Sequence, residues 1–307
     1  SATLTDAPMT ELPHRYRALD AFAAPARARS ELWRTFLGAV FAVAAYLGIT
    51  LLAFEVLRAA VSPLISDALI DAFTAGRTAT GMTLLLFSFL GLVAGVVVAL
   101  RLLHRRSVLT LVGPFRPAAA DFFLVTIAVT ALALVLMPLS VGSDQVGRHL
   151  TLGQFFAWLP LAIPGLLVQT GAEELAFRGY LQQQLGARYR SPFMWLLLPS
   201  VLFGALHYAP DVYGPGAIWI ALWAVLFACL AADLTARTGN LGAAIGLHFA
   251  NNFSAICLVG VYGDMDGLAL YNVVVNLNDF SAVAPLLVVD FAWIVVVWLL
   301  ARLVLRV

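Results

Sequence analysis

The sequence predicts an all-α protein, a polytopic bundle of about eight transmembrane helices with both termini in the cytoplasm. Of its 307 residues, 62% are hydrophobic and only 11% are charged, whereas soluble domains carry about 25% charged residues. A spanning helix needs about 20 mostly apolar residues. By that criterion, candidate helices lie at residues 35–59, 80–103, 120–140, 155–180, 193–209, 216–236, 241–260 and 283–304.

A polar stretch, residues 1–31, precedes these runs. We expect it to be a cytoplasmic segment attached to a single transmembrane domain, residues 32–307. The stretch is longer and more charged than the start of a signal peptide, and the first apolar run is long enough to span, so we expect a retained helix. The fourth run contains Pro160 and Pro164, which favour kinks. The fifth run is short and ends in the turn-forming sequence APDVYGPG.

Arginine supplies all eighteen basic residues, and its distribution predicts the orientation. With the N-terminus inside, Arg58, Arg77 and Arg148 fall in outer segments, Arg178 lies within a span, and the other fourteen fall in inner segments. This excess follows the positive-inside rule. The absence of lysine and the abundant alanine suggest a bacterial protein, which we place in the inner membrane. A net charge of +1 without a basic stripe argues against nucleic-acid binding.

Three charged residues interrupt the apolar pattern in GAEELAFRGYLQQQ, residues 171–184. Ionisable groups at membrane depth are expensive and face a partner or a water-filled cavity. Glu174 and Arg178 are four residues apart and share a helix face, so we expect an ion pair. Glu173 is rotated by about 100°, and we expect it to face a cavity. The ordinary alternative is an ion-pair cluster at a helix end near the headgroups.

Two of the five histidines lie in apolar runs: His207 in the fifth and His248 in the seventh. The helical rise places His248 at about the same depth as Glu173, with His207 somewhat deeper. Each of the two alone is more often a hydrogen-bonded core residue than a catalyst. The other three fall in polar or interfacial segments, where solvated side chains are expected: His14, His104 and His149.

A spacing of four residues links each of these two histidines to a second side chain. His248 and Asn252 project from one helix face, as do Phe203 and His207. An interhelical hydrogen bond is the ordinary alternative for Asn252, and simple packing is the ordinary alternative for Phe203.

This set of side chains can support hydrolysis of an amide. Glu173 and His207 could polarise one water between them, because a carboxylate in a low dielectric is a better base. His248 and Asn252 could donate hydrogen bonds to the oxyanion. No serine or cysteine stands in a nucleophile motif, and the two cysteines have no metal-site or disulfide spacing. No cofactor is firmly implied, but His207, His248 and Glu173 could bind zinc with an open position.

The order Glu173-Glu174-x-x-x-Arg178, Phe203-x-x-x-His207, His248-x-x-x-Asn252 resembles the three motifs of the CAAX protease and bacteriocin-processing (CPBP, or Abi) family, which includes the type II CAAX prenyl endopeptidases. The resemblance covers mainly residues 120–260. It implies an intramembrane endopeptidase whose site opens toward the cytoplasm and whose substrate is a membrane-associated peptide or protein, prenylated in the CAAX branch. Glu173 would be the general base, His207 would assist it, and His248 with Asn252 would form the oxyanion site. Glu174 and Arg178 would support them, and the mechanism would be glutamic or metal-dependent.

Two other readings predict different functions. A non-catalytic protein of the same family, acting in bacteriocin immunity or as a membrane scaffold, would use the polar cluster only to hold the bundle together. A proton-coupled transporter would use Glu173 and the histidines as a relay. The missing inverted repeats argue against a transporter.

Overall fold

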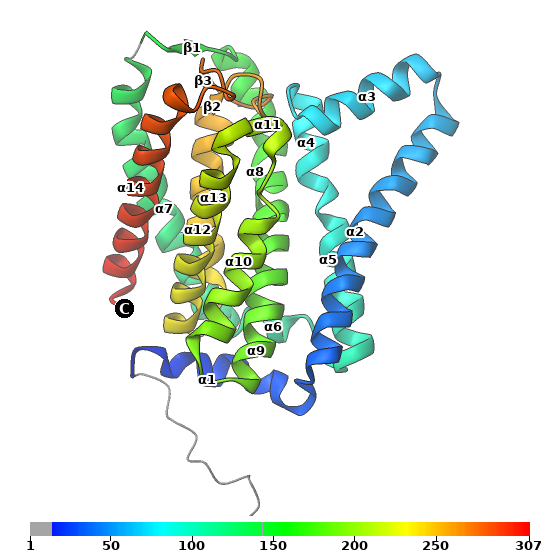
Figure 1. Ribbon diagram of the computed structural model, residues 1–307, viewed down its shortest axis with the longest axis vertical. Helices are drawn as coiled ribbons and strands as arrows, with labels where there is room; N and C mark the ends of the chain where they lie inside the picture. The colour runs from blue at the N-terminus through cyan, green and yellow to red at the C-terminus, as the bar shows by residue number, and fades with distance from the viewer. Residues whose placement is uncertain (1–13, 143) are drawn as a thin grey trace, which may run out of the picture.

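The computed structural model describes residues 14–142 and 144–307, so the first thirteen residues of the polar segment 1–31 lie outside the described residues. The predicted all-α class is confirmed, since long helices run side by side along the longest axis of the molecule (Figure 1). The helices of ten residues or more are α2 (Leu32–Ala60), α3 (Pro63–Ala75), α4 (Ala79–Ser88), α5 (Leu90–Ala99), α7 (Phe115–Val141), α8 (Leu152–Glu174), α12 (Ala217–Thr238), α13 (Gly242–Asn252) and α14 (Phe280–Leu305).

Shorter elements connect and extend these helices. The short α-helices are α1 (Arg17–Ala23), α6 (Leu109–Val112), α9 (Gln183–Arg188), α10 (Leu198–Ala205) and α11 (Pro210–Tyr213). Three segments have 3-10 geometry, η1 (His14–Tyr16), η2 (Ala24–Arg29) and η6 (Gly214–Gly216). Four have the wider π geometry, η3 (Leu100–His104), η4 (Leu175–Gln182), η5 (Phe193–Leu197) and η7 (Phe253–Leu258). Two of the π segments, η4 and η7, directly follow predicted site residues, and such turns are frequent at functional sites.

Six of the eight predicted spans are long and apolar enough to cross a membrane: Leu32–Ala60, Ala79–His104, Phe115–Val141, Leu152–Arg188, Pro210–Thr238 and Phe280–Leu305. By length and composition, these six helices point to an integral membrane protein. The fifth predicted run forms the shorter helix Phe193–Ala205, about 20 Å long at 1.5 Å per residue, against a hydrocarbon core of about 30 Å. The seventh forms α13 and η7, of 11 and 6 residues. The count of eight crossings and the cytoplasmic placement of the termini are therefore not confirmed.

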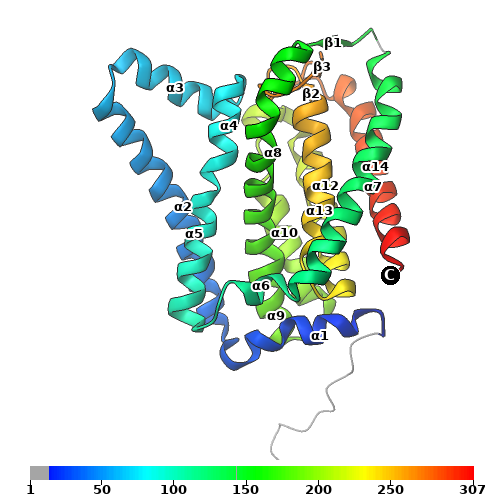
Figure 2. The ribbon, with the colours of Figure 1, turned by 180° about the vertical axis from the view of Figure 1, so that it is seen from behind.

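The bundle has two different ends, which we name after the elements that cover them. At the apical end, a small sheet that the sequence did not predict joins β1 (Val146–Arg148), β2 (Val259–Val261) and β3 (Tyr271–Val273). Its order is β1-β3-β2, with β1 antiparallel and β2 parallel to β3. At the basal end, α1 lies across the ends of the long helices (Figures 1 and 2).

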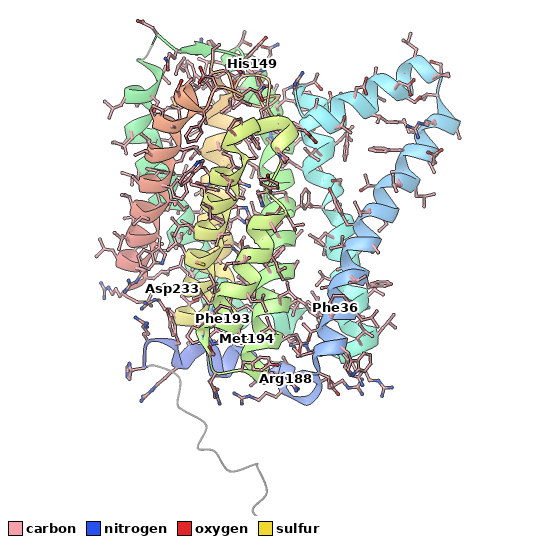
Figure 3. The ribbon with its side chains drawn as sticks, viewed as in Figure 1. Phe36, His149, Arg188, Phe193, Met194 and Asp233 are labelled. Carbon is pink, nitrogen blue, oxygen red and sulfur yellow. The ribbon has the colours of Figure 1, made fainter. Side chains whose placement is uncertain are left out.

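The N-terminal segment His14–Arg29 packs against the basal end. The Tyr16 hydroxyl donates to Asp233 Oδ1 of α12 at 2.8 Å, and both side chains are buried. Gln183 of α9 donates to the main-chain carbonyl of Phe22 at 2.7 Å. Figure 3 shows Asp233 and Arg188 close to this end and His149 at the opposite end. The described part of the predicted polar segment is therefore a folded cap over the bundle.

The cap explains why one histidine prediction is wrong. His104 is only 4% exposed, not solvated. Its Nδ1 lies 2.8 Å from the carbonyl oxygen of Arg29 in the cap, and its Nε2 lies 2.8 Å from the hydroxyl of Tyr180. His14 and His149 are exposed, as predicted.

Packing density differs between the two sides of the bundle. Helix α13 lies so close to α7 that a Cβ added at Gly242 would fall 1.8 Å from the carbonyl oxygen of Ala118. Small residues allow such close approach between membrane helices. In contrast, α2 diverges from α4 toward the apical end, and α3 bridges the two (Figures 1 and 2). We call α2, α3 and α4 the wing. The candidate site lies in the densely packed part, on α8, α10 and α13.

Candidate active site

The glutamate pair occupies the last two positions of α8. This helix begins at a capping box formed by Thr151 and Gln154 and contains two internal prolines. Directly after Glu174 the backbone continues as the π segment η4, which carries Arg178. The two glutamates therefore lie where the helix changes from α to π geometry, inside the apolar segment Leu152–Arg188.

The predicted ion pair between Glu174 and Arg178 is present. Arg178 Nη1 lies 3.0 Å from Glu174 Oε1, and the two side chains are 2% and 0% exposed. The guanidinium also lies over the rings of Phe203, at 4.9 Å, and Phe227, at 5.8 Å, in cation–π geometry. Burying such a pair costs hydration; the aromatic faces and His248 compensate part of that cost, while Glu174 Oε2 and Arg178 Nη2 have no hydrogen-bond partner among the described residues.

His248 lies between the two glutamates. Its Nδ1 is 2.8 Å from Glu174 Oε1, and its Nε2 is 3.6 Å from Glu173 Oε2. The ring also packs edge-on against Phe227, with centroids 4.7 Å apart. A carboxylate on Nδ1 fixes the orientation of an imidazole. Glu173 and His248 therefore lie at the same level of the bundle, and Glu174 contacts both Arg178 and His248.

Asn252 contacts a residue that sequence reasoning missed. Its Nδ2 donates to Gln169 Oε1 of α8 at 2.9 Å. Gln169 stands four residues before Glu173 and so lies on the same face of α8. The sequence signal that could have identified Gln169 was its position four residues before Glu173 in the same apolar run.

His207 stands apart from this cluster. It lies in the turn after α10, and its Nδ1 is 2.8 Å from the carbonyl oxygen of Phe203 in that helix. Within residues 14–142 and 144–307, no hydrogen bond or ion pair joins His207 to Glu173 or His248. Phe203 connects the two parts, because its ring lies 4.6 Å from that of His207 and 6.3 Å from that of His248. It is also a buried core residue, as the packing alternative predicts.

The proposed metal ligands do not gather around one point. Among the residues that the structure describes, no group of three or more His, Cys, Asp or Glu side chains could hold a metal ion. The set His207, His248 and Glu173 is thus not assembled in this conformation. We derive no step through a metal.

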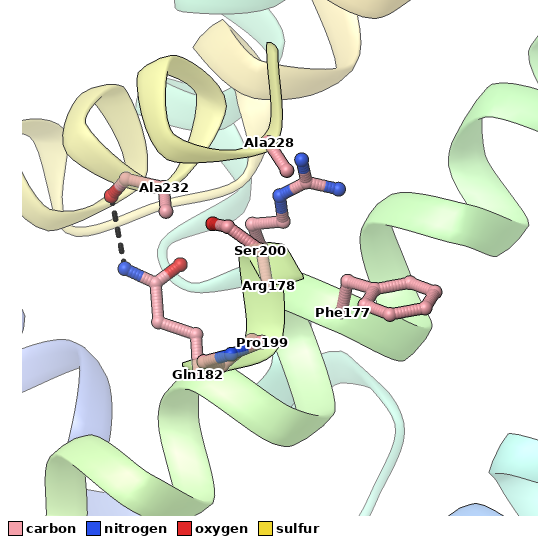
Figure 4. Close-up of a pocket in the computed structure, with 7 residues that line it drawn as sticks. All are labelled: Phe177, Arg178, Gln182, Pro199, Ser200, Ala228 and Ala232. Atoms are coloured by element: carbon pink, nitrogen blue, oxygen red, sulfur yellow. Dashed lines mark hydrogen bonds between the residues drawn. The ribbon is translucent and has the colours of Figure 1, made fainter. Parts of the chain in front are cut away.

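A small pocket lies beside the site, between η4, α10 and α12 (Figure 4). Arg178 is its only predicted site residue, and Gln182 donates to the carbonyl of Ala232 at 2.9 Å along its wall. The lining residues are Phe177, Arg178, Gln182, Pro199, Ser200, Ala228 and Ala232. This pocket is therefore next to the ion pair but does not contain the glutamate–histidine cluster.

Comparison with known proteins matches the segment that carries these residues to a family. Residues 154–254 match the family described as type II CAAX prenyl endopeptidase Rce1-like, and this segment contains Glu173, Phe203, His207, His248 and Asn252. The chain is also 28% identical over 274 residues to the uncharacterized protein YyaK of Bacillus subtilis (strain 168), an alignment covering 81% of this chain and 87% of that protein. No solved structure matches significantly. The match of residues 154–254 to the Rce1-like family agrees with the resemblance that the three motifs indicated.

Proposed function

We propose that this protein is an intramembrane endopeptidase that hydrolyses a peptide bond of a membrane-associated or lipidated substrate, from a site open to the cytoplasm of a bacterial inner membrane. The observation that supports this most is the position of His248 between Glu173 and Glu174, at 3.6 and 2.8 Å. Ionisable groups are energetically costly inside a membrane, and those that occur there usually belong to a functional site. The Rce1-like match of residues 154–254 supports the class of reaction.

In the proposed mechanism, Glu173 is the general base. It is the less buried of the two glutamates and is free of the Arg178 pair, so it can take a proton from a bound water while the water oxygen attacks the scissile carbonyl. Asn252 and His248 donate to the developing oxyanion. The C–N bond then breaks, and the proton held by Glu173 passes to the leaving amine. His207 would join Glu173 at the water once substrate is bound, because catalytic contacts often tighten only in the complex.

The principal test compares the wild type with Glu173→Gln, which keeps the shape and removes the base. Mass spectrometry of cell membranes containing each protein identifies cleavage products that depend on Glu173. A synthetic peptide spanning that cleavage site then serves as substrate for purified protein in lipid nanodiscs. We expect kcat to fall at least about 100-fold, the lower end of the contribution of a general base. Glu55→Gln is the matched control, since Glu55 is an exposed glutamate paired with Arg58 outside the site.

Identical products from wild type and Glu173→Gln would contradict the proposal. The non-catalytic alternative, bacteriocin immunity or a membrane scaffold, has one observation in its favour: both nitrogens of His248 already face groups of the protein. That alternative predicts that Glu173→Gln lowers thermal stability and phenotype in parallel and that no peptide product appears.

A metal-dependent mechanism makes a separate prediction. If His207, His248 and Glu173 take up zinc when substrate binds, chelators abolish cleavage and elemental analysis finds about one zinc per chain. If the mechanism is glutamic, as we propose, cleavage continues in the presence of a chelator and without stoichiometric metal.

A further inference from the structure

Gln169 is a buried amide inside the apolar helix α8. It is 7% exposed, and a buried amide without a hydrogen bond is destabilising. Among the residues that the structure describes, its hydrogen-bond partner is Asn252, whose Nδ2 donates to Gln169 Oε1 at 2.9 Å. This apolar helix therefore contains a buried polar residue that is hydrogen-bonded to a predicted site residue.

The two helices form two matching pairs across their interface. Gln169 and Glu173 lie one turn apart on α8, while His248 and Asn252 lie one turn apart on α13. Gln169 contacts Asn252 at 2.9 Å, and Glu173 faces His248 at 3.6 Å. The pair Gln169–Asn252 therefore lies one helix turn along the interface from the pair formed by His248 and Glu173, the proposed base.

The contact fixes the direction of the Asn252 amide. Its Nδ2 carries two hydrogens in the plane of the amide, and the one that bonds Gln169 determines where the other points. Within the part of the chain that the structure describes, the other hydrogen bond of this side chain is a longer one, 3.4 Å from Asn251 Nδ2 to Asn252 Oδ1. Rotation of the amide is therefore limited mainly by Gln169.

We propose that Gln169 is a positioning residue for peptide hydrolysis: it orients Asn252 so that the second Nδ2 hydrogen points at the oxyanion. This inference rests on the proposed function. Donors act most strongly when they are oriented before the reaction, and small misplacements of catalytic groups can reduce rates about 100-fold. Gln169 itself does not touch the reacting atoms.

The test is a double-mutant cycle on the purified full chain in nanodiscs, with the synthetic peptide defined by the Glu173-dependent cleavage. The variants are Gln169→Leu, Asn252→Ala and the double variant; Gln169→Met replaces Gln169→Leu if the latter does not fold. We expect Gln169→Leu to lower kcat by about 10- to 100-fold with KM changed less than about twofold. Because Gln169 acts through Asn252, adding Gln169→Leu to Asn252→Ala should lower kcat no further.

Thr170→Val is the matched control. Thr170 is the next residue of α8, is fully buried, and donates only to the Leu166 carbonyl at 2.8 Å. Its variant should keep the wild-type kcat. A kcat for Gln169→Leu within twofold of the wild type, or losses that multiply in the double variant, would overturn the positioning role while the proposed function stands. If no product depends on Glu173, the proposed function fails and the positioning role fails with it.

Discussion

Two arginine–glutamate pairs of almost the same spacing stand in opposite surroundings. Arg178 and Glu174, in the densely packed part, are 3.0 Å apart with side chains 2% and 0% exposed. Arg58 and Glu55, near the end of α2 in the wing, are 2.6 Å apart and 48% and 67% exposed. The exposed pair is the shorter of the two. Distance alone therefore does not tell which pair matters to the protein.

The surroundings determine the energy of each pair. Exposed ion pairs contribute about 0–1 kcal/mol, because water or headgroups replace the partner. When one member of a buried pair is removed, the other charge is left without hydration or partner. Large apolar side chains are exposed in both parts, such as Phe36, which Figure 3 shows on α2 near the basal end, and Leu303 of α14. In a bilayer, lipid tails are as apolar as these side chains.

The largest expected effect on stability is the difference between replacing Arg178 and replacing Arg58. We expect Arg178→Met to lower the free energy of unfolding by about 3–5 kcal/mol, since Glu174 is left as a buried, half-compensated carboxylate. Arg58→Met should change it by no more than about 1 kcal/mol. Equilibrium unfolding of the detergent-solubilised variants measures both. Equal losses would show that the two surroundings are energetically alike.

A smaller effect should come from two glycines on α2, one in each kind of surroundings. A Cβ at Gly38 would lie 2.0 Å from the hydroxyl oxygen of Tyr180, which is held by His104 Nε2 at 2.8 Å. We expect Gly38→Ala to cost about 1–3 kcal/mol through overpacking. At Gly48 nothing lies within 4 Å of an added Cβ. Gly48→Ala should be neutral or stabilise by up to about 1 kcal/mol, because alanine is the better helix former.

Thermal unfolding of the two alanine variants checks this prediction. A loss at Gly48 equal to that at Gly38 would mean that the wing packs against something in the folded protein. Retained stability at Gly38 would mean that the contact between α2 and Tyr180 is loose.

Local spacing was enough to predict part of this molecule. The Glu174–Arg178 pair follows from a separation of four residues on one helix, and six spans follow from run length. The contacts that spacing did not reveal join distant segments. His104 is buried because the cap folds over it from 75 residues away, and Gln169 meets Asn252 across 83 residues. His207 lies two residues beyond Ala205, where α10 ends, so the helical periodicity of its run did not determine its neighbours.

The smallest effect concerns a third ion pair, intermediate in exposure, that holds the cap. Asp20 accepts a hydrogen bond from Arg190, and the two side chains are 44% and 29% exposed. The hydrogen bond from Arg190 holds the pKa of Asp20 below its usual value, against an opposing effect of burial, and the contact with Arg27 lowers it further. The folded pKa is thus lower than the unfolded one, about 3.9. The stabilisation is complete above that value and is lost as the pH falls through the folded pKa.

Mild acid should therefore loosen the cap. We expect amide hydrogen exchange in α1 and η2, corrected for its intrinsic pH dependence, to rise as the pH falls from about 5 to 3. Exchange in Asp20→Asn should already be raised at pH 6 and respond less to acid. The change should amount to less than about 1 kcal/mol, because half-exposed charges are well solvated. If Asp20→Asn and wild type respond to acid alike, a group other than Asp20 holds the cap in place. The exposure of the three ion pairs would then not predict the order of their contributions to stability.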